Sequence, residues 1–189
     1  NCNGFKKVTV PGTIKTIGNY AFSGCKGLTS VTVSGTVKTI GQYAFSGCTS
    51  LKTAVIKNGV ESIGFHTFQQ CTALESLTLP YAGLKDNCID SENAISTYLF
   101  NQYAPKGTYS ASRPGGSGGY GIPETLTSIT ITGGKIIPKN AFYGMKSLKT
   151  INIPNTITNI GDYAFYGCTL METGVLPSKL TSVGNDAFN

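Results

Sequence analysis

The sequence predicts a repeat solenoid made mainly of short parallel β-strands, and a strict period is the main reason for this expectation. Cys2, Cys25, Cys48 and Cys71 are spaced 23 residues apart, and the segments between them are similar to one another. A fixed period of this size is typical of proteins in which each repeat stacks only on its neighbours. Within each repeat, apolar and polar residues alternate over a short run, which indicates a strand with one buried face.

We call each repeat a rung, and the chain holds about seven rungs of 22–23 residues. They begin at Cys2, Cys25, Cys48, Cys71, Pro123, Met145 and Cys168. Each rung opens with a Leu-x-x-Val-x-Val run, such as residues 28–33, which predicts the strand. A turn follows, and then an apolar pair closed by a glycine, as in Val37, Ile40 and Gly41.

A Tyr-Ala-Phe-x-Gly-Cys stretch or a close variant ends most rungs, with Thr67-Phe68 in place of Ala-Phe in the third. It is too short for an ordinary helix, and we interpret it as a helical or 3₁₀ turn on the convex side. Its phenylalanines are expected to form a single internal stack, because equivalent positions of stacked rungs lie one above another. These residues are Phe22, Phe45, Phe68, Phe142, Phe165 and Phe188.

These motifs carry a family resemblance. Leu-x-x-Leu-x-Leu is the core of leucine-rich repeats, and Ile-Gly-x-x-Ala-Phe-x-x-Cys-x-x-Leu resembles the BspA-like class of bacterial and protozoan surface proteins. The resemblance covers residues 1–80 and 123–189 and implies an extracellular or cell-surface location. Rung five departs from the pattern, with 22 residues and with Ile137-Pro138 where Ile-Gly is usual. Because the chain begins and ends inside a repeat, we expect residues 1–189 to be a single solenoid segment of a longer protein.

An insertion interrupts rung four at residues 81–122. Within it, residues 90–103 are expected to form a helix, because Ile95, Leu99 and Tyr103 recur at helical spacing and Pro105 ends the pattern. That helix is expected to dock on the solenoid. Residues 106–121 are rich in Gly, Ser and Tyr, and we expect them to be a mobile linker.

The charge pattern argues against nucleic acid as a partner. The net charge is +6, but the lysines are dispersed and Arg113 is the only arginine. Nucleic-acid binders usually cluster Arg and Lys on one face and interleave stacking aromatics. A weakly cationic surface suits an acidic polymer or a cell envelope better. No apolar run reaches the roughly 20 residues of a membrane-spanning helix, so no membrane insertion is expected in this segment.

Metal and catalytic sites are not indicated, so we expect neither an enzyme nor a cofactor. Five of the six cysteines share one repeat position, where Met145 stands in another rung, so we interpret them as buried, reduced thiols. Cys88 is out of register, and a disulfide ladder is the alternative for the other five. His66 is the only histidine and stands where other rungs have Tyr20, Tyr43 and Tyr163, so it is expected to join an aromatic ladder.

The outward side of the strands is the candidate site, with tyrosines of the insertion at its rim. The alternation places these residues there: Thr9, Thr32, Val55, Thr78, Thr130, Asn152 and Val175, with Tyr98, Tyr103 and Tyr109 at the rim. Threonine is also a good solvent-facing strand residue, so this face is either a contact surface or merely solvated.

The sequence therefore favours a non-catalytic binding module that mediates protein–protein interaction or adhesion. Its expected partner is a protein or a glycan at a cell surface, on host cells, matrix or other microbes. The alternatives are a structural spacer in a larger surface protein and a carbohydrate-binding module. The absence of tryptophan weakens the last of these, although ten tyrosines keep it open.

Overall fold

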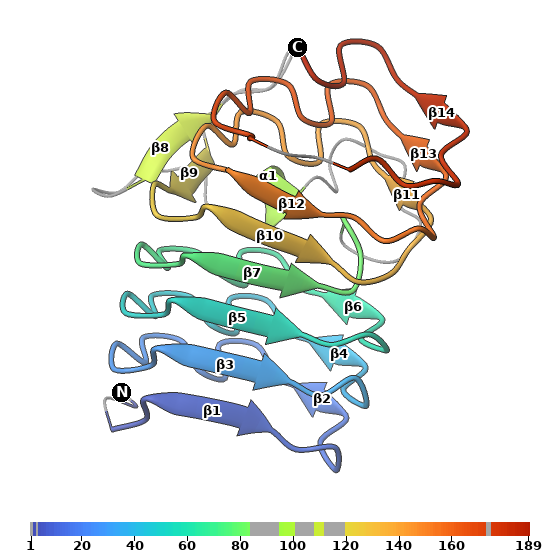
Figure 1. The fold of residues 1–189 in the computed structure, drawn as a ribbon. Helices are drawn as coiled ribbons and strands as arrows, with labels where there is room; N and C mark the ends of the chain where they lie inside the picture. Colours follow the sequence, from blue (N-terminus) through green and yellow to red (C-terminus); the bar gives the residue numbers. More distant parts are fainter. Residues whose placement is uncertain (1, 3, 84–94, 101–107, 112–119, 173–174) are drawn as a thin grey trace.

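The chain forms a parallel β-solenoid, as the repeat predicts. The computed structural model describes residues 2, 4–83, 95–100, 108–111, 120–172 and 175–189. One parallel sheet runs the length of the solenoid (Figure 1). Its six strands, in spatial order, are β1 (Lys7–Val10), β3 (Ser30–Val33), β5 (Thr53–Ile56), β7 (Ser76–Leu79), β10 (Ser128–Ile131) and β12 (Thr150–Asn152).

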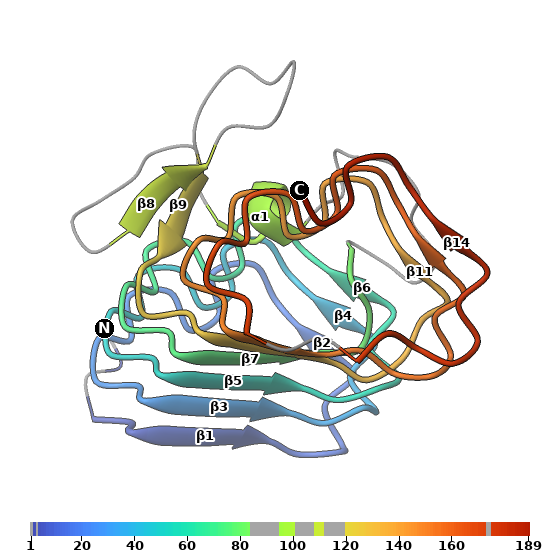
Figure 2. The ribbon, with the colours of Figure 1, turned by 45° about the horizontal axis from the view of Figure 1, so that its top comes forward.

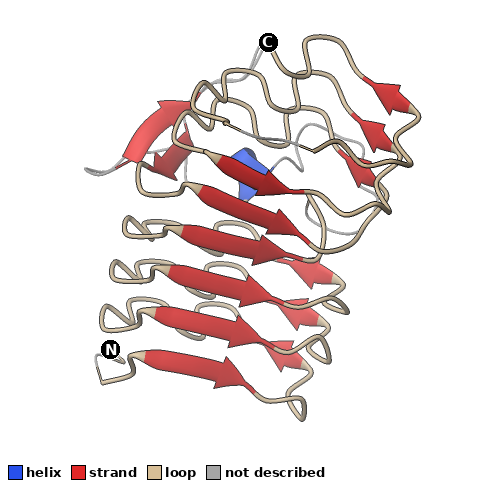
Figure 3. Ribbon diagram, in the orientation of Figure 1, coloured by secondary structure: helices blue, strands red, loops and turns tan. Residues whose placement is uncertain are grey.

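Shorter strands form two smaller parallel sheets that lie behind the long sheet (Figure 2). The first contains β2 (Thr16–Ile17), β4 (Thr39–Ile40) and β6 (Ser62–Ile63). The second contains β11 (Ile136–Ile137), β13 (Asn159–Ile160) and β14 (Ser182–Val183). Rung four separates them, since no strand of the described part of that rung joins β6 to β11. Turns and loops connect these strands, and the helix content is very small (Figure 3).

The core lies between the long sheet and the rest of each coil. Inward strand residues such as Val31, Ala54 and Leu77 are buried at equivalent positions of successive rungs. The phenylalanines stack, but as two groups of three on either side of rung four and not as the single stack that we expected. Ring centroids are 5.3 Å apart for Phe22 and Phe45, 5.7 Å for Phe45 and Phe68, 4.9 Å for Phe142 and Phe165, and 5.0 Å for Phe165 and Phe188.

The Tyr-Ala-Phe stretch is a stack of hydrogen-bonded turns, so the expected helical or 3₁₀ turn is not formed. The amide of Ala21 donates to Gly18 O within its rung, whereas the amide of Phe22 donates to Ala44 O of the next rung. Tyr20 has a φ of +57°, and the equivalent residue of each later rung with a described position is also left-handed. A helix requires consecutive amides to bond within one segment, which this alternation prevents.

Glycine at the end of each short strand allows adjacent rungs to approach closely. A Cβ atom placed on Gly64 would lie 2.4 Å from the backbone nitrogen of Gln42 in the rung before it. The equivalent Gly41, Gly161 and Gly184 meet the preceding rung in the same way. Pro138 replaces this glycine in rung five, where the preceding rung has no second strand among the described residues.

Rung four is rebuilt by the end of the segment that we expected to be one insertion. The amide of His66 donates to Tyr98 O at 2.5 Å, and the amide of Phe68 donates to Leu99 O at 3.1 Å. Leu99 therefore takes the backbone position of the usual alanine, and Phe100 follows it and is fully buried. The segment of residues 81–122 is thus two excursions from the solenoid, separated by a return at residues 95–100.

Both secondary-structure expectations for this segment need correction. The helix α1 spans only Ile95–Tyr98, and the rest of the expected helix, residues 90–94 and 99–103, is non-helical or lies outside the described residues. Within the expected linker, β8 (Thr108–Ala111) pairs antiparallel with β9 (Tyr120–Pro123). Alternating residues of these short runs satisfy each other's backbone across the hairpin, which composition alone did not indicate. The remaining linker residues lie outside the described part of the chain.

The phenylalanine stack provides the first testable prediction. Phe45→Ala removes a fully buried ring that stacks on a neighbour at each side, so we expect it to lower the free energy of unfolding by about 3–5 kcal/mol. Phe188→Ala is the control, because its ring stacks on one neighbour and is 44% exposed. Denaturant titration followed by circular dichroism measures both losses. Equal losses would show that the internal stack does not dominate the stability of a rung.

The closing glycine provides the second prediction. Gly64→Ala forces a Cβ against backbone of the preceding rung, so we expect a loss of about 1–3 kcal/mol in the free energy of unfolding. Gly18→Ala makes the same change where no atom lies within 4 Å, and its effect should stay within about 0.5 kcal/mol. Thermal and urea unfolding of the two variants test this contrast. If both variants match the parent protein, close backbone approach is not the reason for the glycine.

Candidate binding surface

The outward side of the six-stranded sheet brings most of the predicted site residues into one row. The register pairs Thr9 with Thr32, Thr32 with Val55, Val55 with Thr78, Thr78 with Thr130, and Thr130 with Asn152. A second outward row aligns Lys7, Ser30, Thr53, Ser76, Ser128 and Thr150. We call these two rows together the strand face. At the usual strand spacing the face is about 25 Å long.

The strand face is rich in hydroxyl groups that can both donate and accept hydrogen bonds. Nine of its twelve residues are Ser or Thr, and the other three are Lys7, Val55 and Asn152. Some of these groups already bond to each other: Ser76 Oγ lies 3.4 Å from Thr53 Oγ1, and Asn152 Nδ2 donates to Thr130 Oγ1 at 3.3 Å. The face carries no acidic or histidine side chain at these positions, so it offers polar contacts and no acid–base pair.

The structure places the remaining predicted site residues differently. Val175 is 89% exposed and lies outside every described strand, although it borders a shallow hollow beside Asn152. Tyr98 is fully buried, and its hydroxyl donates to Gly83 O, so this residue belongs to the core and not to the rim of the surface. Tyr103 lies outside the described residues. Tyr109 lies in β8 of the hairpin.

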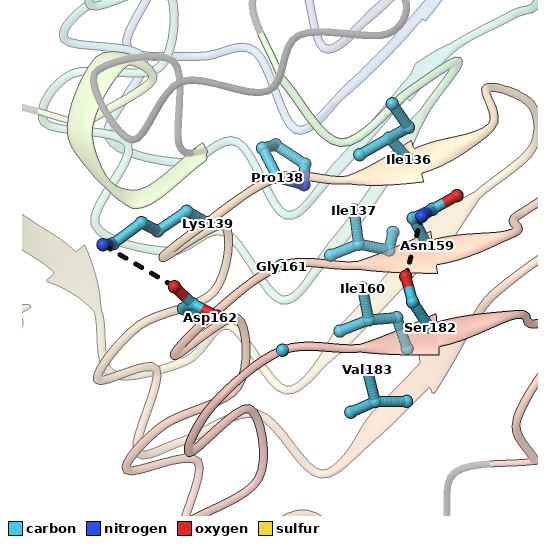
Figure 4. A pocket seen from close by; sticks show the side chains of 11 residues that line it. Ile136, Ile137, Pro138, Lys139, Asn159, Ile160, Gly161, Asp162, Ser182 and Val183 are labelled. Atoms are coloured by element: carbon cyan, nitrogen blue, oxygen red, sulfur yellow. Dashed lines mark hydrogen bonds and ion pairs between the residues drawn. The ribbon is translucent and has the colours of Figure 1, made fainter.

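An open groove of about 460 Å³ runs along β11, β13 and β14 (Figure 4). Aliphatic side chains such as Ile137 and Ile160 line its middle. Asn159 Nδ2 donates to Ser182 Oγ at 2.7 Å at one end, and Lys139 Nζ lies 3.8 Å from Asp162 Oδ2 at the other. None of its lining residues is aromatic, so the groove lacks the stacking platform that a sugar ring prefers.

A second hollow, of about 570 Å³, lies where rung four leaves the coil. It is lined by turn residues of rungs two, three and five together with Pro80 and Tyr81. Asn58 of rung three bonds directly to Thr132 of rung five here: Nδ2 donates to the Thr132 carbonyl at 3.0 Å, and the Thr132 hydroxyl donates to Oδ1 at 2.5 Å. Sequence reasoning missed this hollow, because it results from two turns meeting across the interrupted rung.

The five cysteines that the structure describes are free thiols, of which Cys25, Cys48 and Cys71 are buried as expected, whereas Cys2 and Cys168 are only partly buried because they lie in the outer rungs. The thiols of Cys48, Cys71 and Cys168 donate to the carbonyl oxygens of Phe22, Phe45 and Phe142, each at 3.2 Å. Burial is the largest cause that raises the pKa of Cys48 and of Cys168 to about 12. A thiol that ionises so late is a poor nucleophile and a poor metal ligand at neutral pH.

His66 joins the aromatic ladder, as predicted from its repeat position. Tyr20 and Tyr43 stack with ring centroids 4.9 Å apart, and the His66 ring lies 5.1 Å from that of Tyr43. In the described part of the chain, no three His, Cys, Asp or Glu side chains lie close enough to hold a metal ion. Also within that part, no helix has the length and apolar character needed to span a membrane.

The parallel coil, its inward Leu and Phe rows and its outward strand face define a leucine-rich repeat solenoid. The model of the BspA-type leucine-rich repeat region matches residues 1–104 and 122–189, with six copies of the repeat. The chain therefore belongs to the BspA-type leucine-rich repeat family. The match continues to residue 104, which agrees with the return of the chain to rung four at residues 95–100.

Solved structures of bacterial leucine-rich repeat proteins have a similar fold. A leucine-rich repeat protein from Eubacterium ventriosum is 25% identical, with a TM-score of 0.65, and the match covers 97% of this chain and 42% of that one. A leucine-rich cell surface protein from Faecalibacterium prausnitzii is 24% identical, with a TM-score of 0.50, and the match covers 97% of this chain and 45% of that one. The chain thus spans less than half of either protein. A comparison with curated proteins found no match.

The cysteine row provides a prediction for alkaline pH. The folded-state pKa of Cys48 and Cys168 is raised to about 12, whereas a thiol of the unfolded chain ionises near about 8.5. Between these pH values the unfolded state binds fewer protons than the native state, so the free energy of unfolding falls as pH rises. Urea titrations from about pH 7 to about pH 10 should show this decline. It should be weaker in a Cys48→Ala, Cys168→Ala variant, and parallel curves would exclude a contribution from these thiols.

Proposed function

We propose that this chain is a non-catalytic binding module of a cell-surface or secreted protein and that the strand face is its contact surface. The partner is a protein or a glycan at a cell surface, and the role of the complex is adhesion. One observation carries this proposal: six strands present a continuous, register-aligned surface on which nine of twelve side chains are Ser or Thr. An extended surface of this kind suits a macromolecule better than a small metabolite, which needs an enclosing pocket.

The location at a cell surface is supported by family membership and by a structural neighbour. The Faecalibacterium prausnitzii protein is described as a leucine-rich cell surface protein. Non-catalytic binding is also consistent with the chemistry of the strand face, whose outward positions combine hydroxyls, one amide and one ammonium group. Tyr109 remains part of the proposed surface, because its strand β8 pairs with β9, which leads into rung five and lies beside the beginning of β10 (Figure 1). Tyr103, which lies outside the described residues, remains part of the proposal from the sequence alone. Tyr98 is left out because its side chain is buried.

A variant with a neutral change in the middle of the strand face tests the surface. Thr32→Gln with Thr78→Gln replaces two short side chains by longer ones that keep the charge and the backbone unaltered. A binding screen against matrix proteins and glycans first identifies a partner. We expect the variant to bind that partner with about tenfold lower affinity, because the longer side chains hold the partner further from the sheet.

The matched control is Thr16→Gln with Thr39→Gln, which makes the same change at exposed positions of β2 and β4. It should retain the affinity of the parent chain. If the two double variants bind alike, the strand face is not the contact surface. If adhesion of the full-length protein survives replacement of residues 1–189 by an unrelated rigid spacer, the chain is a structural spacer and the proposed function is wrong.

A further inference from the structure

We propose that the first three rungs of the strand face bind an anionic polysaccharide that carries carboxylate or sulfate groups. This inference rests on the proposed function, since it assigns a class of partner to the N-terminal part of the same surface. The observation behind it is the distribution of charge among the rungs, which the repeat pattern itself does not require.

Nearly all of the net positive charge lies in the first three rungs. Residues 1–70, which make up these rungs, have a net charge of +6, with one acidic residue, Glu61, and seven lysines: Lys6, Lys7, Lys15, Lys26, Lys38, Lys52 and Lys57. Residues 123–189 contain five lysines and four acidic residues, a net charge of +1. All seven lysines of the N-terminal set are exposed. An anion near the solenoid therefore experiences a field that is concentrated at one end of the molecule.

Two of these lysines are neutralised, and five are not. Lys38 Nζ lies 2.7 Å from Glu61 Oε1, and Lys52 Nζ lies 2.8 Å from Glu75 Oε1. The other five form no ion pair with any residue that the structure describes. Glu61 and Glu75 each lie in the rung that follows the rung of the lysine they bind. The five lysines without an ion pair therefore leave a positive charge on rungs one to three.

Four of the five unpaired lysines lie at or near the ends of the first three strands. Lys7 is itself an outward residue of β1, and Lys6 precedes it. The amide of Thr29 donates to Lys6 O at 2.7 Å, and Lys26 lies three residues before Thr29, so Lys6, Lys7 and Lys26 occupy backbone positions at or shortly before the start of β1 and β3. Lys57 follows the buried Ile56 directly at the other end of β5.

The arrangement suits a charged sugar chain that crosses the strands. Lysine ammonium groups at both ends of the strands can neutralise separate carboxylate or sulfate groups, and the Thr and Ser hydroxyls between them can bond to sugar hydroxyls. Nucleic acid fits less well. The outward positions of β1, β3 and β5 hold no aromatic side chain on which a base could stack, and none of the seven basic residues is arginine.

The experiment uses residues 1–189 and four probes: heparin, polygalacturonate, neutral dextran and a DNA duplex of about 20 base pairs. We expect the parent chain to bind heparin or polygalacturonate more tightly than DNA and not to bind dextran. Binding should weaken as sodium chloride rises from about 50 mM to about 500 mM, because salt screens exposed charges. DNA binding at equal or higher affinity, or no binding of either charged glycan, would overturn the proposal.

A matched pair of variants separates a localised surface from net charge. Lys7→Gln, Lys26→Gln, Lys57→Gln should lower the affinity for the charged glycans by about tenfold or more. Lys135→Gln, Lys146→Gln, Lys179→Gln removes the same charge from exposed positions of the C-terminal rungs and should change it less than about twofold. Equal losses in the two variants would show that net charge alone causes binding and would overturn the assignment of this surface.

Failure of this inference and failure of the proposed function are distinguishable. A partner that depends on Thr32 and Thr78 but is indifferent to the lysine variant leaves the proposed function in place and contradicts the polysaccharide. Circular dichroism of every variant confirms folding, and all six substituted lysines are exposed, so their replacement removes no core contact.

Discussion

The backbone of each rung must lie in register on the backbone of the next, and the rest of the structure depends on this constraint. In a parallel coil, strand amides and carbonyls have no partner within their own rung, so the neighbouring rung must satisfy them. The closing glycines follow from the resulting close approach, and the Phe and Leu rows follow from the repetition of equivalent inward positions. Rung five shows where a change of length is tolerated. It lacks one residue in the turn between β10 and β11, while its strand and its Phe142 keep their register.

Rung four shows that the long sheet tolerates a long insertion between two of its strands. β10 pairs directly with β7 although about 50 residues separate them in sequence, and Thr125 Oγ1 donates to Leu74 O at 2.7 Å across the same boundary. Behind the sheet, Phe100 re-enters the core, while Asn58 and Thr132 connect the turns on either side of the missing short strand. The core and one long sheet are therefore continuous, and only the second sheet is divided. Loop closure costs little for a long excursion provided that both ends return to register.

Sequence reasoning identified those features that recur with the period. The spacing of Cys25 and Cys48 correctly predicted the strand register, and the position of His66 correctly predicted its place beside Tyr43. Features without a repeat were missed. Leu99 and Phe100 lack the flanking Ile-Gly and Gly-Cys that mark most other rungs, so the helical spacing of Leu99 with Ile95 and Tyr103 misled the interpretation. The outward position of Thr32 followed from alternation, whereas the burial of Tyr98 depends on a fold-back to Gly83 that no local pattern indicates.

The repeat fixes the backbone lattice but leaves the outward side chains independent of it. Lys6, Thr29, Lys52 and Glu75 occupy the same backbone position of four successive rungs, joined by amide–carbonyl bonds, and this position is positive in two rungs, neutral in one and negative in one. Because such positions carry no packing constraint, their chemistry can vary along the solenoid without loss of the coil. Glu61 and Glu75 pair with Lys38 and Lys52 at the boundary between the lysine-rich rungs and the rest. Because of this boundary, the surroundings of the strand face are more positively charged at its N-terminal end than at its C-terminal end. A partner that recognises hydroxyls alone would meet equivalent rows throughout the face, whereas a charged partner would distinguish its two ends.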